Sequence, residues 1–215
     1  DYRGIFEEAV DALRQEKRYR VFADIERIAG RFPRAVFRDS ADNAREITIW
    51  CSNDYLGMGQ NDLVVKAMQE TAGRLGVGAG GTRNISGTNR PLVELERSLA
   101  DLHRKESALV FTSGFVSNEA AISTIARLLP DCLILSDQLN HASMIEGVRR
   151  SGGQKQIWGH NDLAHLEMLL KAAGRDRPKL IVFESVYSMD GDVAPVGAIA
   201  DLAGALFRAA GAPED

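Results

Sequence analysis

The sequence predicts a three-layer α/β fold, in which a mainly parallel sheet lies between two layers of helices. Two segments, CLILS (132–136) and KLIVFE (179–184), are continuously apolar, which is typical of parallel strands buried on both faces. Around them, apolar residues recur at the spacing of amphipathic helices. Strands that alternate with helices in this way form parallel sheets with helices on both faces.

The first half of the chain contains signals for three helices and one strand. Residues 4–18 (GIFEEAVDALRQEKR) have apolar side chains at helical spacing, and so do residues 63–68. Residues 46–51 (EITIWC) are rich in β-branched side chains and are expected to form a strand. A stripe of leucines over 92–102 predicts a third helix, with Pro91 in its first turn.

The second half alternates strand and helix regularly. Asn161 is of a residue type favoured at helix N-caps, and it is expected to cap the third helix of this half. The expected elements are strand 107–111 (SALVF), helix 115–128, strand 132–136, helix 142–150, strand 155–158, a helix ending near Gly174, strand 179–184 and a helix after Pro195.

The amino-acid composition disfavours several classes of protein function. The 215 residues include 26 Lys plus Arg and 30 Asp plus Glu, and this net acidic charge disfavours nucleic-acid binding. The apolar runs are strand-sized and too short to span a bilayer. Cys51 and Cys132 are too few for a disulfide framework, so a reducing cytoplasm is expected. The chain starts at Asp1 without a Met, so we expect it to be trimmed or partial.

A glycine-rich stretch, GVGAGGTRNISGT (76–88), follows the second helix. It is not a dinucleotide-binding motif, because a helix rather than a strand precedes it. It is either a flexible loop or a loop whose glycines let the backbone approach a ligand. In the second case, Thr82, Arg83, Asn84 and Ser86 supply polar groups suited to an anion.

The segment VFTSGFVSNEAA (110–121) has the pattern of a strand, a short turn and a helix. Such a helix start directs free N–H groups at one point, where a phosphate is stabilised. Ser113, Gly114 and Phe115 lie at this turn, and Asn118 follows one turn later. Phe115 is equally compatible with a place in the core.

Polar residues also follow the two apolar strands. His141 comes after CLILS, where it can either contact a planar ligand or cap the next helix. Glu184, Ser185 and Ser188 follow KLIVFE at the same expected sheet edge. Together with Ser113, these residues predict an active-site crevice at the carboxyl ends of the strands.

Two other polar features are less informative. His160 and His165 are five residues apart, which does not place two metal ligands on one helix face, so no metal site is expected. The basic residues from Arg14 to Arg20 have the pattern of a solvated helix face. Arg20 lies where the chain leaves the first helix, and it can serve as a single anion anchor.

Taken together, the motifs closely resemble the α-oxoamine synthases, which are pyridoxal-phosphate enzymes of the aspartate-aminotransferase fold. The resemblance extends from about Tyr2 to about Leu202, and as a set the motifs are very specific. RYRVF–DIER, WCSNDYLGM and GGTRNISGT are most similar to the members that join glycine to succinyl-CoA, with loss of CoA and carbon dioxide. The motifs are WCSNDYLGM (50–58), GAGGTRNISGT (78–88), FTSGFVSN (111–118), DQLNHASMIEG (137–147), HNDL (160–163) and FESVYSMDGD (183–192).

The resemblance implies pyridoxal 5′-phosphate as cofactor, glycine and succinyl-CoA as substrates, and a homodimer with a shared active site. By motif, Arg20, Thr82 and Asn84 match groups that hold the succinyl carboxylate, and Asn53 matches a contact to glycine. The residues that match cofactor contacts are Ser113, Gly114 and Phe115 with Asn118 at the phosphate and ring, His141 stacked on the ring, and Ser188 near the phenolic oxygen.

The chain departs from the family pattern in two respects. Leu92 stands where relatives usually carry His, and no Asp-Glu-x-His motif or Schiff-base lysine segment follows IADLA (199–203). We therefore expect an N-terminal fragment, with an N-terminal segment over 1–60 and a partial cofactor-binding large domain over 61–215, incomplete at the C-terminus. The alternatives are a glycine C-acetyltransferase, an 8-amino-7-oxononanoate synthase, or a non-catalytic cofactor-binding or dimerisation module.

Overall fold

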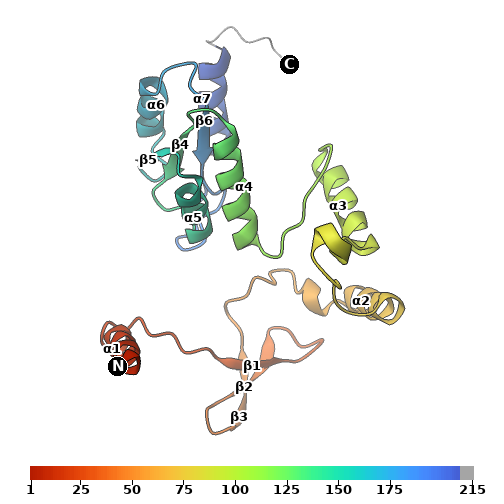
Figure 1. Cartoon of the computed structure of the whole chain (residues 1–215). Coiled ribbons are helices and arrows are strands. Elements are labelled where there is room, and N and C mark those ends of the chain that lie inside the picture. The colour runs from red at the N-terminus through yellow and green to blue at the C-terminus, as the bar shows by residue number, and fades with distance from the viewer. Residues whose placement is uncertain (209–215) are drawn as a thin grey trace. The chain divides into compact units, whose positions relative to one another are not determined.

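The computed structural model describes residues 1–208, and the chain divides into two compact units, Asp1–Gly87 and Thr88–Asp215. Each unit is described by itself (Figure 1). The expected division at residue 60 concerns domains of a complete enzyme and stays a prediction. No helix among the described residues is long and apolar enough to cross a membrane.

Unit 1 contains two α-helices, two short helical turns and an antiparallel sheet. The sheet has the order β1-β2-β3, and the strand expected over 46–51 is its third strand, two residues earlier in the chain. The first two strands were not expected, because their charged residues break the apolar pattern. The elements are α1 (Tyr2–Gln15), β1 (Asp24–Arg27), β2 (Arg34–Arg38), β3 (Ala44–Thr48), the short helix η1 (Met58–Gln60), α2 (Asp62–Leu75) and the π-helical turn η2 (Arg83–Gly87).

Helix boundaries in unit 1 follow local backbone chemistry. α1 ends at Gln15 rather than near Arg18, because Lys17 has a left-handed φ of 56°. α2 begins after Asn61, whose side chain accepts hydrogen bonds from two N–H groups of the first turn. It ends at Gly76, where φ is 76°.

Unit 2 is built around a parallel sheet, as expected. β4 (Leu133–Asp137) is the central strand and pairs in parallel with β5 (Gln154–Trp158) and with β6 (Lys179–Val182). Every residue of β4 is buried. The continuous apolar composition of this strand therefore reflects burial on both faces.

Helices cover both faces of this sheet, which confirms the three-layer α/β class (Figure 1). Leu133 and Leu135 pack on the side of α6 (Leu163–Ala172) and α7 (Val196–Arg208). Ile134 points to the opposite face, where it packs with residues of α4 (Gly114–Leu128) and α5 (Ala142–Ser151). This alternation along one strand produces two separate apolar clusters.

One expected strand does not form. Residues 107–111 follow α3 (Arg90–His103) as irregular chain, and Leu109 is exposed. The N–H of Val110 donates to the Glu96 carboxylate of α3 at 2.8 Å. In a paired strand, an N–H group would instead donate to the backbone of a neighbouring strand. Sequence composition favours a strand here, but no strand among residues 1–208 pairs with it.

A second correction concerns the start of α6. Its N-cap is Asp162, whose carboxylate accepts from the His165 N–H at 2.9 Å, and not Asn161. Asn161 has a left-handed φ of 54°, and its N–H donates to the buried Asp137 carboxylate at 3.2 Å. This tertiary contact fixes Asn161 outside the helix.

Candidate active site

The N-terminus of α4 forms an open, polar turn. Ser113 is the N-cap, and its hydroxyl accepts from the Val116 N–H at 3.2 Å. Gly114 begins the helix, and a Cβ placed on it would meet no atom within 4 Å. The first N–H groups of a helix lack intrahelical partners and carry partial positive charge. This turn can therefore accept an anion in free space.

His141 caps the neighbouring helix α5. Its Nδ1 accepts from the Ser143 N–H at 3.1 Å and lies 2.7 Å from the Ser143 hydroxyl. The capping interpretation is therefore confirmed, and it is compatible with contact to a planar ligand because the His141 side chain is exposed. With Nδ1 accepting, a neutral ring carries its proton on Nε2.

The structure brings Phe115 and Asn118 of α4 to His141. The rings of Phe115 and His141 meet edge to face, with centroids 6.3 Å apart. The Asn118 amide donates to the Ser143 hydroxyl at 3.0 Å, and this hydroxyl contacts His141. Asn118 thus acts on the histidine through Ser143 and helps to fix the ring.

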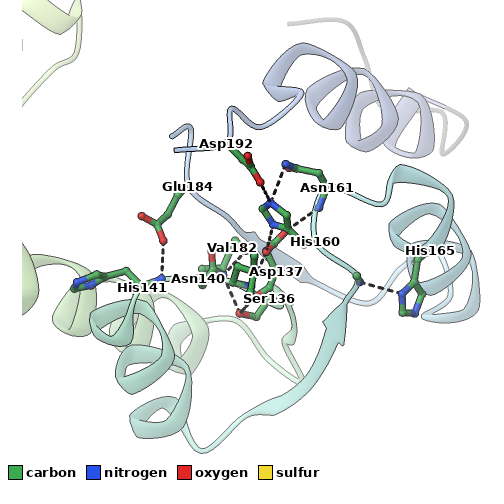
Figure 2. A network of polar contacts seen from close by, with 12 residues as sticks. Ser136, Asp137, Asn140, His141, His160, Asn161, His165, Val182, Glu184 and Asp192 are labelled. Atoms are coloured by element: carbon green, nitrogen blue, oxygen red, sulfur yellow. Dashed lines mark hydrogen bonds and ion pairs between the residues drawn. The ribbon is translucent and has the colours of Figure 1, made fainter. Parts of the chain in front are cut away.

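The carboxyl ends of β4 and β6 meet at the same edge (Figure 2). The buried Asn140 amide donates to the Ser136 hydroxyl at 2.9 Å and to the Val182 carbonyl at 2.8 Å. The His141 N–H donates to the Glu184 carboxylate at 2.6 Å. The residues after each strand are therefore tied together, as an active-site edge requires.

Ser188 lies in the segment that continues from β6. This segment folds back on itself, since Val186 bridges Val193 and the Tyr187 N–H donates to the Asp192 carbonyl at 2.9 Å. Gly191 allows the turn with a φ of 77°. Ser188 is exposed within it.

An ion-pair network at the same edge, which begins at a buried carboxylate and ends at an exposed one, was not predicted from the sequence. Asp137, at the end of β4, is 1% exposed and lies 3.0 Å from His160 Nδ1. His160 Nε2 lies 3.1 Å from the Asp192 carboxylate. The strings DQLN, HNDL and MDGD contain Asp137, His160 and Asp192, but nothing in their spacing along the chain shows that they meet.

The network shifts two pKa values in opposite directions. Burial alone would raise the pKa of Asp137, but bonds from His160 and from the N–H groups of Leu139 and Asn161 lower it below its ordinary value. The bond to Asp137 raises the pKa of His160, with a smaller contribution from Asp192. Both shifts favour an imidazolium between two carboxylates.

The glycine-rich stretch of unit 1 is a closed turn. The Thr82 carbonyl accepts from the N–H groups of Ile85, Ser86 and Gly87, at 2.8 to 3.2 Å. A Cβ on Gly87 would lie 2.2 Å from the Gly81 carbonyl oxygen, so only glycine fits there. Thr82 is exposed on this turn.

The remaining predicted residues also lie in unit 1. Arg20 is exposed between α1 and β1, Asn53 is exposed before η1, and Asn84 is exposed on the glycine-rich turn. The structure therefore brings Phe115 and Asn118 to His141, with Ser113 and Gly114 at the start of the same helix α4. Ser188 lies on the exposed segment after β6. The four substrate candidates occupy three segments of unit 1.

Comparison with protein families gives one match. The family model described as aminotransferase class I and II matches residues 45–208. A 5-aminolevulinate synthase from Bradyrhizobium diazoefficiens is 66% identical over 203 residues, and one from Rhizobium meliloti is 57% identical over 203 residues. Each alignment covers 94% of this chain. The chain spans about half the length of these curated relatives, 49% and 50% respectively.

Solved structures agree on the fold. A serine palmitoyltransferase from S. paucimobilis with a bound PLP–myriocin aldimine superposes with a TM-score of 0.78 at 27% identity. A serine palmitoyltransferase from Sphingomonas wittichii gives 0.81 at 25% identity. Each match covers 94% of this chain and 49% of the solved one.

Proposed function

The chain belongs to the aminotransferase class I and II family, and from this premise we propose that it supplies the N-terminal half of a 5-aminolevulinate synthase. Such an enzyme condenses glycine with succinyl-CoA to 5-aminolevulinate, CoA and carbon dioxide, the first step of tetrapyrrole and heme synthesis. The observation that carries the proposal is 66% identity over 203 residues to a relative of that name.

Pyridoxal 5′-phosphate is the proposed cofactor, and the residues at the sheet edge fit it. Its phosphate suits the turn at Ser113, Gly114 and Phe115, because the first N–H groups of α4 lack intrahelical partners and the space beside Gly114 is open. Its planar ring suits the exposed imidazole of His141. When bound, the cofactor supplies an electron sink for the carbanion formed at the glycine α-carbon.

The chain's own residues would bind the cofactor and fix its orientation. His141 would stack on the ring, and its Nδ1 bonds to Ser143 keep the imidazole plane fixed against α5. Asn118 would act through Ser143 to maintain this orientation. Ser188 would approach the phenolic oxygen from the folded segment after β6.

Substrate recognition is assigned to unit 1. Arg20, Thr82 and Asn84 would bind the succinyl carboxylate, because a guanidinium and short polar donors suit that group. Asn53 would contact glycine. We also propose a homodimer in which two subunits share each site, and a cytoplasmic location, in keeping with the reducing environment expected from the sequence.

The residues proposed to bind the succinyl carboxylate also distinguish between the possible acyl donors. An acetyl donor needs no cation, so an exposed Arg20 with Thr82 and Asn84 favours a carboxylate-bearing donor over the substrate of a glycine C-acetyltransferase. The names of the most similar relatives reported above support the same choice.

A chimera tests the proposal. The 203 matched residues would replace the corresponding half of the Bradyrhizobium enzyme, joined to that enzyme's own C-terminal half. We expect growth of a bacterial strain that requires 5-aminolevulinate, and formation of the product from glycine and succinyl-CoA by the purified chimera. His141→Ala should abolish both, whereas His103→Ala, at the end of α3, should not. A folded chimera without product would contradict the proposal.

A further inference from the structure

His160 connects three segments that are distant in sequence (Figure 2). Its Nδ1 lies 3.0 Å from the Asp137 carboxylate at the end of β4, and its Nε2 lies 3.1 Å from the Asp192 carboxylate after β6. Its ring meets the Tyr187 ring edge to face, with centroids 4.3 Å apart. The proposed function gives none of these residues a role.

The two carboxylates define the charge of the imidazole. An ionised carboxylate only accepts hydrogen bonds, and a neutral imidazole can donate from only one nitrogen. Both contacts are satisfied together when both ring nitrogens carry hydrogen. The amide nitrogen of the half-buried Asn161 lies 3.2 Å from Nε2, and turning the amide by 180° would place its buried, unpartnered oxygen there as a further acceptor.

The groups that His160 contacts after β6 belong to one folded segment. Tyr187 and Asp192 lie at the two ends of a loop that is closed by the Tyr187 N–H to Asp192 carbonyl bond and by the Gly191 N–H to Tyr187 carbonyl bond, both 2.9 Å. The exposed Ser188 lies within this loop. A cation that bridges Asp137 and Asp192 therefore anchors the loop to the end of the central strand.

We propose that His160 is a positioning residue: as an imidazolium bonded to Asp137 and Asp192, it fixes the 185–192 segment, and with it Ser188, at the carboxyl edge of the parallel sheet. The inference rests on the proposed function only for the role given to Ser188. The anchoring itself is a property of the chain without cofactor or substrate.

The proposal has a defined pH dependence. The titratable groups facing His160 are Asp137 from β4, and Asp192 and Tyr187 from the segment after β6. The neighbouring Asp162 and His165 are engaged elsewhere, since they bond the His165 N–H and the Gly159 N–H respectively.

The pKa of His160 is raised in the folded chain. The contribution of His160 to the stability of the fold is therefore fully present below the ordinary imidazole pKa, and it is lost as pH rises through the raised pKa. The pKa of Asp137 is lowered, so its contribution is present above the ordinary carboxyl pKa and is lost as pH falls through the lowered value. The segment should be held near neutral pH and released in alkali.

Amide hydrogen exchange of the 215-residue chain, followed by NMR, tests the anchoring. Exchange of the Tyr187, Gly191 and Ala194 N–H groups would be compared at about pH 6 and about pH 9, on either side of the ordinary imidazole pKa, after correction for intrinsic rates. We expect corrected exchange to be severalfold faster at the higher pH. The midpoint should coincide with titration of the His160 ring resonances.

Variants separate anchoring from general stability. His160→Gln should exchange rapidly at both pH values, and so should Asp192→Ala, which removes the acceptor for Nε2 and retains the Asp137–His160 pair. His165→Gln is the matched control and should keep the wild-type pH dependence. Equal corrected rates at both pH values in the wild type, or wild-type behaviour of Asp192→Ala, would refute the proposal. If His160→Gln does not fold, Asp192→Ala decides alone.

No cofactor or turnover enters this measurement. A chimera without activity but with pH-dependent exchange would overturn the proposed function and leave the anchoring intact. An active chimera together with pH-independent exchange would overturn the anchoring and leave the proposed function intact.

Discussion

One residue at the sheet edge, His141, has an observed structural role that bears on its proposed contact with a ligand. His141 caps α5 through Nδ1, and this bond leaves its exposed ring fixed in orientation. Its N–H meanwhile donates to Glu184, so His141 connects the start of α5 to the segment after β6. Because a histidine already fixed by the fold loses little freedom on contact with a ligand, this cap would favour the proposed ligand contact.

Arg20 gives the sharpest prediction for a single residue. In a complete enzyme that contains this half, Arg20→Leu should raise the KM for succinyl-CoA and relax the preference toward uncharged acyl-CoA donors. Losing a charge-assisted hydrogen bond should cost about 1.5–3 kcal/mol. Steady-state kinetics with succinyl-CoA and acetyl-CoA measure the change. Arg18→Leu, two positions earlier and paired with Glu16, is the control. An unchanged acyl preference would refute the assignment of Arg20.

Sequence position predicted part of the site and could not predict the rest. The place of His141 at the carboxyl edge of the sheet was predictable, because residues that follow a buried parallel strand lie there. The Asp137–His160–Asp192 contacts were missed because their three segments approach one another only through tertiary packing. These contacts depend on the burial of Asp137. The sequence does not indicate that burial, because a charged residue after an apolar strand such as CLILS is usually expected to be exposed.

At the scale of elements, the contact between α4 and α5 depends on Gly147. A Cβ at this position would lie 3.0 Å from both the Asn118 carbonyl oxygen and the Ile122 Cβ. Gly147→Ala should therefore destabilise the fold by about 1–3 kcal/mol through overpacking. Urea unfolding measures the loss.

A matched control exists in α7. Gly197 also lies in a helix, and a Cβ there would meet no atom within 4 Å. Gly197→Ala should leave stability unchanged or raise it by up to about 1 kcal/mol, because alanine is the better helix former. Equal effects of the two substitutions would show that close packing does not govern the α4–α5 contact.

Elements were predictable where burial and pattern agree. β4 was found because burial on both faces makes its composition continuously apolar. β1 and β2 were missed, because their mixed charged and apolar residues suit a small sheet that is largely exposed. Residues 107–111 have strand composition, yet a strand needs a pairing partner, and composition says nothing of partners.

For the whole molecule, the two units differ in their cores. Among the described residues of unit 1, Ala35 is the one buried apolar side chain, whereas Phe22 and Trp50 are 94% and 93% exposed. Unit 2 has two apolar clusters around its sheet. Stability measured on the chain should therefore report mainly on unit 2.

We expect the 215-residue chain alone to form no 5-aminolevulinate. Schiff-base chemistry needs a lysine at the cofactor ring, and the three lysines next to the parallel sheet lie elsewhere; the fourth lysine of unit 2, Lys105, follows α3. Lys155 and Lys179 are at the amino ends of β5 and β6, and Lys179 Nζ donates to the Arg175 and Arg177 carbonyls. Lys171 pairs with Glu167 on α6.

Borohydride trapping provides the measurement. The purified chain would be incubated with pyridoxal phosphate, reduced and digested, and labelled lysines would be mapped by mass spectrometry. We expect weak, non-covalent binding and no single stoichiometric label. One fully labelled lysine, together with turnover of glycine and succinyl-CoA, would contradict this expectation. The Bradyrhizobium enzyme is the positive control.

The closed glycine-rich turn has a consequence for the energetics of recognition. Three N–H groups already bond the Thr82 carbonyl, and Gly87 is packed against Gly81. Ordering a flexible loop of this length on binding would sacrifice about 1–2 kcal/mol of conformational entropy per residue. Here that loss occurs when the chain folds, so a ligand that uses Thr82 and Asn84 would retain most of its contact energy as affinity.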